Sequence, residues 1–185
     1  MLLYAYPTAC GGGSDPMEQT GANLTPRPVC ESESEMTHLV LPNDANPLGA
    51  LLGGTLMHWI DLAGALAAHR HARSYVVTAS IEHLDFLVPV QVGDLVVLRS
   101  SINRAFHSSM EVGVKVWVEN YLAGTLRHVS SAYLTFVAVD QHSRHLPVPP
   151  AVPETDEQRR RYEDAARRRD ARNSERERKR LAKAQ

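Results

Sequence analysis

One apolar helix followed by a long stretch of alternating sequence limits the folds open to this chain. From Gly53 to about Ala72 the residues favour helix and are apolar on nearly every side, which predicts a buried helix. Between residues 75 and 140 apolar and polar side chains alternate, most plainly at the even-numbered valines from 112 to 118, as in strands with one buried face. Turn residues divide this stretch into about four strands. A further strand at residues 37–41 completes an α+β fold in which an antiparallel sheet covers one helix.

The segments on either side differ in composition from this domain. Residues 1–35 contain three consecutive glycines, four prolines and few large apolar side chains, so we predict a disordered N-terminal tail. The domain is expected to span residues 36–150, and residues 151–185 to form a charged C-terminal helix after a proline-rich break.

Charge and cysteine content narrow the possible partners and the location. The net charge is −1, and residues 154–185 hold twelve bases against eight acids, a mixed pattern typical of a solvated helix. We therefore expect neither nucleic acid nor membrane as a partner, and no segment approaches the roughly 20 apolar residues that span a bilayer. The two cysteines, Cys10 and Cys30, are too few for a disulfide framework, which favours a cytoplasmic location. His69 and His71 lack partners at ligand spacing, so no metal site is expected.

Asp61 is the most informative residue, because it interrupts the apolar helix. Burying a carboxylate costs several kcal/mol unless it is paired, so either a structural hydrogen bond, for example to His58, or a catalytic role must account for it. Gly53 and Gly54 precede the helix. They fit a tight turn, and they also fit a site where unpaired N–H groups bind a carbonyl oxygen.

The residues around Asp61 resemble a known family. Residues 43–61, NDANPLGALLGGTLMHWID, resemble the signature of hotdog acyl-CoA thioesterases of the bacterial short-chain and brain cytosolic type. Segments 77–79, 85–94, 108–112 and 136–140 resemble that family's later strand motifs in order and spacing, so the resemblance covers about residues 36–165.

The resemblance implies a hotdog fold, a five-stranded antiparallel sheet wrapped around one central helix. It implies a homodimer paired edge to edge, assembled as a trimer of dimers, with Asn46 and Asp61 meeting from opposite subunits as catalytic residues. The backbone N–H of Gly54 would help Asn46 to hold the carbonyl oxygen, and Asp61 would act as base or as nucleophile. No cofactor is implied, since coenzyme A is part of the substrate and product.

The same resemblance indicates residues that bind the substrate. These are Gly53, Arg104, His107, Ser108 and Ser109. Two positions depart from the family pattern: Phe106-His107 replaces a Gly-Arg pair before the serines, and Leu52 replaces a Phe. An ordinary hairpin turn is the alternative interpretation of residues 106–109.

The predicted function is hydrolysis of acyl-CoA to a free fatty acid and coenzyme A. A hotdog enoyl-CoA hydratase is one alternative, although that chemistry usually needs a His before Gly53, and this chain has none at the expected position. A non-catalytic acyl-CoA sensor is the other alternative.

Overall fold

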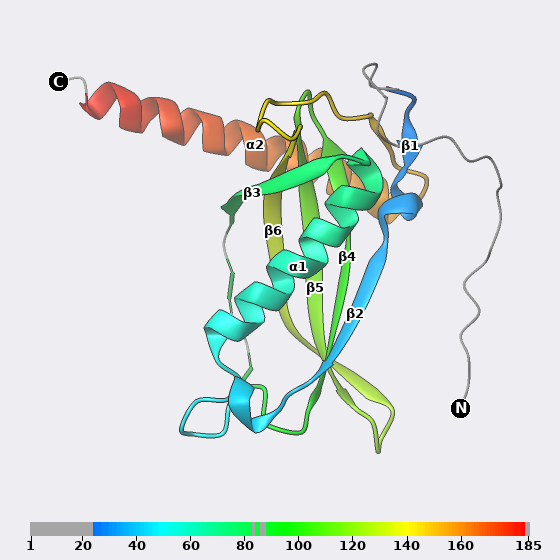
Figure 1. Ribbon diagram of the computed structural model, residues 1–185, viewed down its shortest axis with the longest axis vertical. Helices are drawn as coiled ribbons and strands as arrows, with labels where there is room; N and C mark the ends of the chain where they lie inside the picture. The colour runs from blue at the N-terminus through cyan, green and yellow to red at the C-terminus, as the bar shows by residue number, and fades with distance from the viewer. Residues whose placement is uncertain (1–23, 83, 86–87, 184–185) are drawn as a thin grey trace.

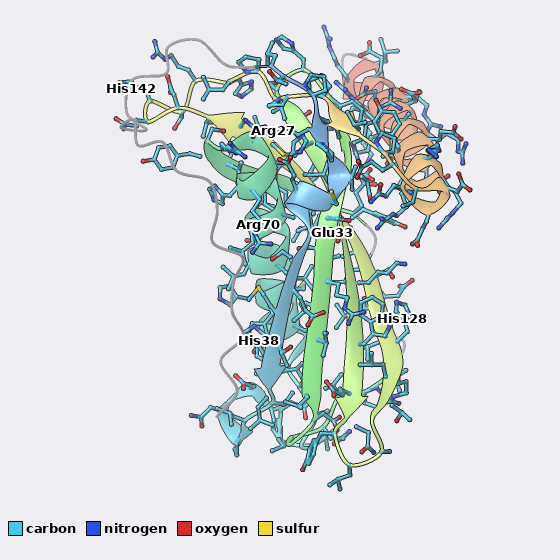
Figure 2. The ribbon with its side chains drawn as sticks, turned by 90° about the vertical axis from the view of Figure 1, so that its right-hand side faces the viewer. Arg27, Glu33, His38, Arg70, His128 and His142 are labelled. Atoms are coloured by element: carbon cyan, nitrogen blue, oxygen red, sulfur yellow. The ribbon has the colours of Figure 1, made fainter. Side chains whose placement is uncertain are left out.

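The computed structural model describes residues 24–82, 84–85 and 88–183, and it shows a curled antiparallel sheet with one helix on each face (Figures 1 and 2). The sheet has five strands in the order β2-β4-β5-β6-β3. Its strands are β2 (Ser34–Leu39), β3 (Tyr75–Ile81), β4 (Leu95–Ala105), β5 (Ser109–Asn120) and β6 (Thr125–Val139). The helix α1 (Gly53–Ala72) lies in the concave face, and α2 (Asp156–Lys183) lies against the opposite face.

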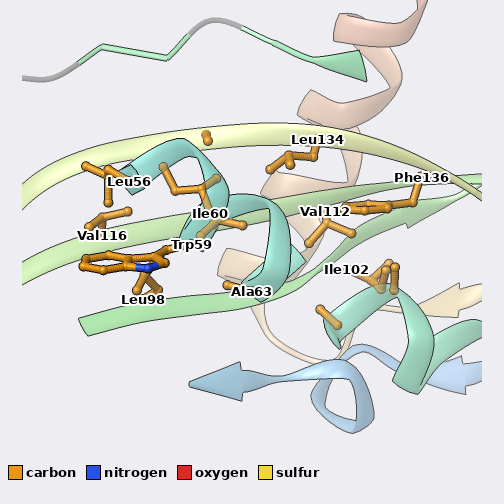
Figure 3. Packing of buried hydrophobic residues seen from close by; sticks show 14 of the residues in the cluster. Leu56, Trp59, Ile60, Ala63, Leu98, Ile102, Val112, Val116, Leu134 and Phe136 are labelled. Carbon is orange, nitrogen blue, oxygen red and sulfur yellow. The ribbon is translucent and has the colours of Figure 1, made fainter. Parts of the chain in front are cut away.

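The predicted strand periodicity corresponds to the observed register. Alternate residues of β4, β5 and β6 point toward α1 and form the core with it, and Val112, Val114 and Val116 have no exposed surface (Figure 3). Antiparallel neighbours bring these residues into line, as in the pairing of Val112 with Leu134. The hotdog fold predicted from the sequence is therefore confirmed.

Small residues allow α1 to approach the sheet closely. Ala63 and Ala67 are fully buried, and a Cβ added at Gly64 would lie 3.0 Å from the ring of Phe136. Ser100 of β4 donates a hydrogen bond to the carbonyl oxygen of Ala63 at 2.6 Å, a contact that larger side chains between helix and strand would prevent.

The sequence predicts a buried helix that is apolar on nearly every side, whereas α1 is buried only on the side that faces the sheet. The helix leaves apolar side chains in solvent, and so does β3, which pairs with β6 alone among the described strands. We call these residues the open apolar edge, and they are 41–59% exposed: Met57, Leu62, Leu66, Tyr75, Val77 and Ile81. The sheet of one chain covers only one side of α1, so these exposed side chains are available to a second surface.

The predicted disordered tail is wrong from residue 24 onward, while residues 1–23 lie outside the described residues. Strand β1 (Arg27–Pro28) pairs with β7 (Ala151–Val152), and the 3₁₀ helix η1 (Val29–Ser32) follows it. Ser32 is fully buried and its Oγ accepts a hydrogen bond from the N–H of Ile102. Order here depends on partners about 70 to 120 residues away in sequence, which local composition does not reveal.

The predicted charged C-terminal helix is present as α2, and a buried ion pair fixes it to the sheet. Glu111 of β5 has no exposed surface, and it accepts hydrogen bonds from Arg168 at 2.6 Å and from Asn103 at 3.0 Å. The Arg168 guanidinium also lies 3.7 Å from the ring centroid of Tyr133. Burial alone would lower the pKa of Arg168, but the hydrogen bond and charge of Glu111 outweigh it and raise that pKa.

Within residues 24–82, 84–85 and 88–183, no helix has the length and apolar character needed to cross a bilayer.

Candidate active site

Asp61 lies on α1 at the open apolar edge, not sealed in the core. Its carboxylate is half-buried, and Oδ1 accepts a hydrogen bond of 2.7 Å from the Thr78 hydroxyl of β3. This bond fixes the orientation of the carboxylate while leaving it accessible from the side of the edge. Thr78 was not among the predicted site residues, because a threonine in a strand is common and only the folded chain brings it to Asp61.

Asn46 lies in the loop before α1, in a turn that fixes its side chain. Its Oδ1 accepts hydrogen bonds from the backbone N–H groups of Leu48, at 2.9 Å, and Ala50, at 3.2 Å. Gly49 completes the turn with a φ of +78°, a value that favours glycine. Since the amide oxygen is occupied by its own loop, the amide nitrogen is the group that Asn46 can offer to another molecule.

The start of α1 carries unpaired donors. Leu52 is the N-cap residue, and its side chain makes no hydrogen bond to the first turn. The first turn also contains no acidic residue. A Cβ built on Gly54 would meet no atom within 4 Å, so the backbone there faces open space. Free N–H groups at the positive end of a helix dipole suit a carbonyl oxygen that becomes negatively charged.

A single chain does not bring these groups together around one reacting atom. Gly54 and Asp61 are seven residues apart on the same face of α1, which corresponds to two turns and about 10 Å. One thioester carbon cannot lie within hydrogen-bonding reach of both groups at that separation. Within one chain, the donors and this carboxylate therefore lie about two helical turns apart.

The hairpin that contains His107, Ser108 and Ser109 lies at the same level of the sheet as Asp61. Ser109 begins β5 and pairs with Val137 of β6, and Val137 pairs in turn with Val77 of β3. The hairpin is thus two strand spacings, about 10 Å, from the β3 edge. His107 is exposed, while its carbonyl oxygen accepts a hydrogen bond from the N–H of Val148.

Arg104 belongs to a different part of the molecule. Its guanidinium lies 4.1 Å from the ring centroid of Tyr162 in α2 and 5.8 Å from that of Phe106. It also donates a hydrogen bond to the carbonyl oxygen of Tyr162 at 3.4 Å. Arg104 thus holds α2 against the sheet, on the face opposite Asp61.

Hollows adjoin both the start of α1 and the outer face of the sheet. A hollow of about 170 Å³ adjoins the start of α1, and its lining is apolar apart from backbone: Ala50, Leu51, Gly53, Leu56, Val88, Pro89 and Val90. A larger hollow of about 510 Å³ lies between α2 and the outer face of the sheet, with charged walls that include Arg99, Glu157 and Arg161. The smaller one adjoins the unpaired donors and suits an alkyl chain, whereas the larger one is separated from Asp61 by the sheet.

His38 and His71 play structural parts. His38 stacks on Trp59 with ring centroids 4.4 Å apart, and burial lowers its pKa despite the nearby charge of Asp44. Predicted as a helix-end residue, His71 is fully buried and its Nε2–H donates to the carbonyl oxygen of Pro149 at 2.9 Å. Across residues 24–82, 84–85 and 88–183, no three or more His, Cys, Asp or Glu side chains are placed to hold a metal ion.

Comparisons with known proteins agree with the fold and site. Residues 48–122 match the family model of the thioesterase superfamily. The uncharacterized acyl-CoA thioester hydrolase YkhA of Bacillus subtilis is 42% identical over 69% of this chain and 74% of its own length. The human cytosolic acyl coenzyme A thioester hydrolase is 31% identical over 77% of this chain, which spans 38% of the human protein.

Solved structures extend the similarity to three dimensions. A hexameric acyl-CoA thioesterase is 40% identical, with a TM-score of 0.79 over 82% of this chain and 97% of that one. An acyl-CoA hydrolase from Staphylococcus aureus is 34% identical, with a TM-score of 0.77 over 86% of this chain and 99% of that one. It was solved with butyryl coenzyme A, coenzyme A and coenzyme A disulfide. The fold and these matches define a thioester hydrolase. The chain belongs to the hotdog acyl-CoA thioesterases of the thioesterase superfamily, as its motifs predict.

Proposed function

We propose that Asp61, Asn46 and the backbone N–H of Gly54 hydrolyse the thioester of an acyl-CoA to a free acid and coenzyme A. The observation that carries this proposal is the Asp61 carboxylate, held by Thr78 at 2.7 Å and still accessible at the open apolar edge. Asp61 can take a proton from water as the water oxygen attacks the carbonyl carbon; the C–S bond then breaks and the thiolate leaves with a proton. It can also attack the carbonyl carbon itself, giving an anhydride that water cleaves.

Asn46 and Gly54 would stabilise the oxygen that becomes negative during this attack. The turn around Asn46 occupies its amide oxygen and leaves the amide N–H group as donor. The Gly54 backbone faces open space at the start of α1. Donors that are already oriented lower the energy of a developing oxyanion without reorganisation, and removing one typically costs 10²- to 10³-fold in rate.

The proposed site is shared between two chains. Seven residues separate Gly54 from Asp61 within one helix, so the donors would act with the Asp61 of a second copy that packs on the open apolar edge. Burial of six exposed apolar side chains supports such a homodimer. The hexameric state of the structural relative supports further assembly as a trimer of dimers.

The variants studied in the Staphylococcus enzyme support the same residues. In that protein an Asn, an Asp and a Thr were each replaced by Ala, and they follow one another at intervals of 15 and 17 residues. Asn46, Asp61 and Thr78 follow at the same intervals in this chain. The correspondence adds Thr78 to the proposed site.

The substrate would occupy two regions. The apolar hollow of about 170 Å³ beside Gly53 would take the acyl chain. The hairpin with exposed His107 and half-buried Ser108 and Ser109 offers polar groups to the coenzyme A phosphates. Arg104 contacts α2 instead, so we do not propose that it binds substrate.

We further propose that the reaction needs no cofactor, since a thioester is already activated and coenzyme A enters within the substrate. A cytoplasmic location is supported by the free thiol of Cys30 and by cytosolic relatives such as the human hydrolase. Neither nucleic acid nor membrane is proposed as a partner.

Release of free thiol from acyl-CoAs of increasing chain length tests the function. Asp61→Ala should lose about 10²- to 10⁴-fold in kcat/KM, the usual contribution of an acid–base group. Asp170→Ala, an exposed carboxylate on α2, is the matched control and should keep the wild-type rate. Equal rates for Asp61→Ala and wild type would remove the proposal, and binding of acyl-CoA without thiol release would favour the sensor instead.

A further inference from the structure

Helix α2 crosses the outer face of the sheet from its middle to its unpaired edge. Arg161 donates to Ser101 of β4 at 3.3 Å, and Arg168 pairs with Glu111 of β5 at 2.6 Å. Arg172 then forms an ion pair with Glu82, the residue that follows β3. The eleven residues from Arg161 to Arg172 rise about 16 Å, which matches the roughly 14 Å between β4 and β3.

Beyond Arg172 the helix continues past its own sheet. Residues 173–183, which we call the α2 arm, extend about 16 Å beyond the β3 edge (Figure 1). Every residue from 173 to 182 is exposed, and the ion pairs of this segment, Glu175–Lys179 and Glu177–Arg180, lie within the arm itself. An isolated helical extension of this length is marginal in water, so contact with another surface would stabilise it.

The edge that the arm passes is the open apolar edge. Tyr75, Val77 and Ile81 of β3 are 59%, 48% and 42% exposed there, and among the described strands β3 pairs with β6 alone. The proposed active site requires a second copy at this edge. A chain placed there lies directly in the path of the arm.

We propose that the α2 arm lies on the partner subunit, against the outer face of its sheet and its α2 helix. This inference rests on the proposed shared site. A two-fold axis between the β3 strands places two such arms side by side in opposite directions, each spanning about three strand spacings of the other subunit. Each subunit therefore holds the other from the outer face as well as along the edge.

The composition of the arm favours a protein surface over a polyanion. The arm, residues 173–183, contains five bases and two acids. The acids already pair with Lys179 and Arg180, which lowers the field available to nucleic acid or an anionic membrane. The mixed charges suit a helix of the same mixed composition, which the partner's α2 provides.

Truncation after Arg172 tests the proposal, because residues 173–182, which it removes, are exposed on their own subunit. Sedimentation velocity over a dilution series should show at least tenfold weaker association than the full chain, with an unchanged thermal unfolding midpoint for the dissociated subunit. Arg70→Ser, an exposed arginine of α1 on the opposite face of the sheet, is the matched control and should associate as wild type.

Trypsin provides a second measurement, since the arm contains Arg176, Arg178, Lys179 and Arg180. Cleavage within the arm should be slow above the dissociation constant and fast below it. Equal association of the truncated and full chains, or cleavage at one rate across the dilution series, would overturn the proposal. So would binding of duplex DNA or anionic vesicles that the truncation abolishes while association stays the same. Association is measured without substrate, so its failure is distinct from a failure to hydrolyse acyl-CoA.

Discussion

The hydrogen bond between Thr78 and Asp61 can be tested by removing a single hydroxyl. Thr78→Val keeps the shape of the side chain but takes away the donor that lies 2.7 Å from Asp61 Oδ1. Thr78 is exposed, so the substitution should leave stability within about 0.5 kcal/mol. A hydrogen bond to a charged group contributes roughly 1.5–3 kcal/mol. If the bond holds the carboxylate in its reactive orientation, that loss corresponds to a decrease of roughly 10- to 150-fold in kcat/KM.

The assay is thiol release from a short acyl-CoA, with Thr78→Ser as the control that retains a donor. We expect kcat to fall while KM changes little, because Thr78 acts through Asp61 and not on the bound substrate. In an Asp61→Ala background the further change Thr78→Val should cost almost nothing. The reasoning is refuted if Thr78→Val keeps the wild-type rate, or if it costs the same factor with and without the Asp61 carboxylate.

Two further predictions concern stability. Arg168→Met leaves the buried carboxylate of Glu111 without its cationic partner and should lower the free energy of unfolding, measured by urea titration, by about 3–5 kcal/mol. The double variant Arg168→Met with Glu111→Leu should recover most of the lost free energy. An Arg168→Met variant as stable as wild type would contradict this prediction. Burial lowers the pKa of His71, although its hydrogen bond to the Pro149 carbonyl opposes the shift, so the folded chain favours neutral imidazole. Stability should therefore be full above the unfolded pKa of about 6.5 and decline as the pH falls below it. His71→Gln should flatten that part of a plot of unfolding temperature against pH, and an unaltered slope would show that other groups titrate.

The parts of the fold that depend on local pattern were predictable. The helix was expected from Gly53 to about Ala72, and α1 has those bounds. Alternation in residues 75–140 corresponds to β3, β4, β5 and β6, because each strand buries one face against the same helix. The sequence also predicted a break at the prolines followed by a charged helix, which corresponds to α2.

The parts of the fold that depend on contacts between residues far apart in the sequence were not predictable. Residues 24–35 fold because Arg27 pairs with Ala151 and because Ser32 reaches the N–H of Ile102, and neither partner can be inferred from a tail rich in Gly, Pro and Ser. Thr78 becomes part of the candidate site only when β3 lies beside α1.

The candidate site was partly predictable for the same reason. Asp61 stands out because a carboxylate is conspicuous in an apolar helix, but only the resemblance to the family, and not the helix pattern, placed it between subunits. The exposed side of α1 contains Met57, Leu62 and Leu66, residues that indicate burial in any single-chain interpretation. Their composition is that of an interface between chains, which hydrophobic pattern alone cannot separate from a core.

The turn around Asn46 restricts which substitutions evolution could accept at this position. The backbone N–H groups of Leu48 and Ala50 need only an oxygen at the γ position, and an aspartate would supply it and keep the loop intact. An aspartate would, however, present a second oxygen where asparagine presents hydrogen. A related protein that no longer catalyses the reaction could therefore carry aspartate at this position without any cost in folding. An aspartate there would indicate that the relative has lost the activity.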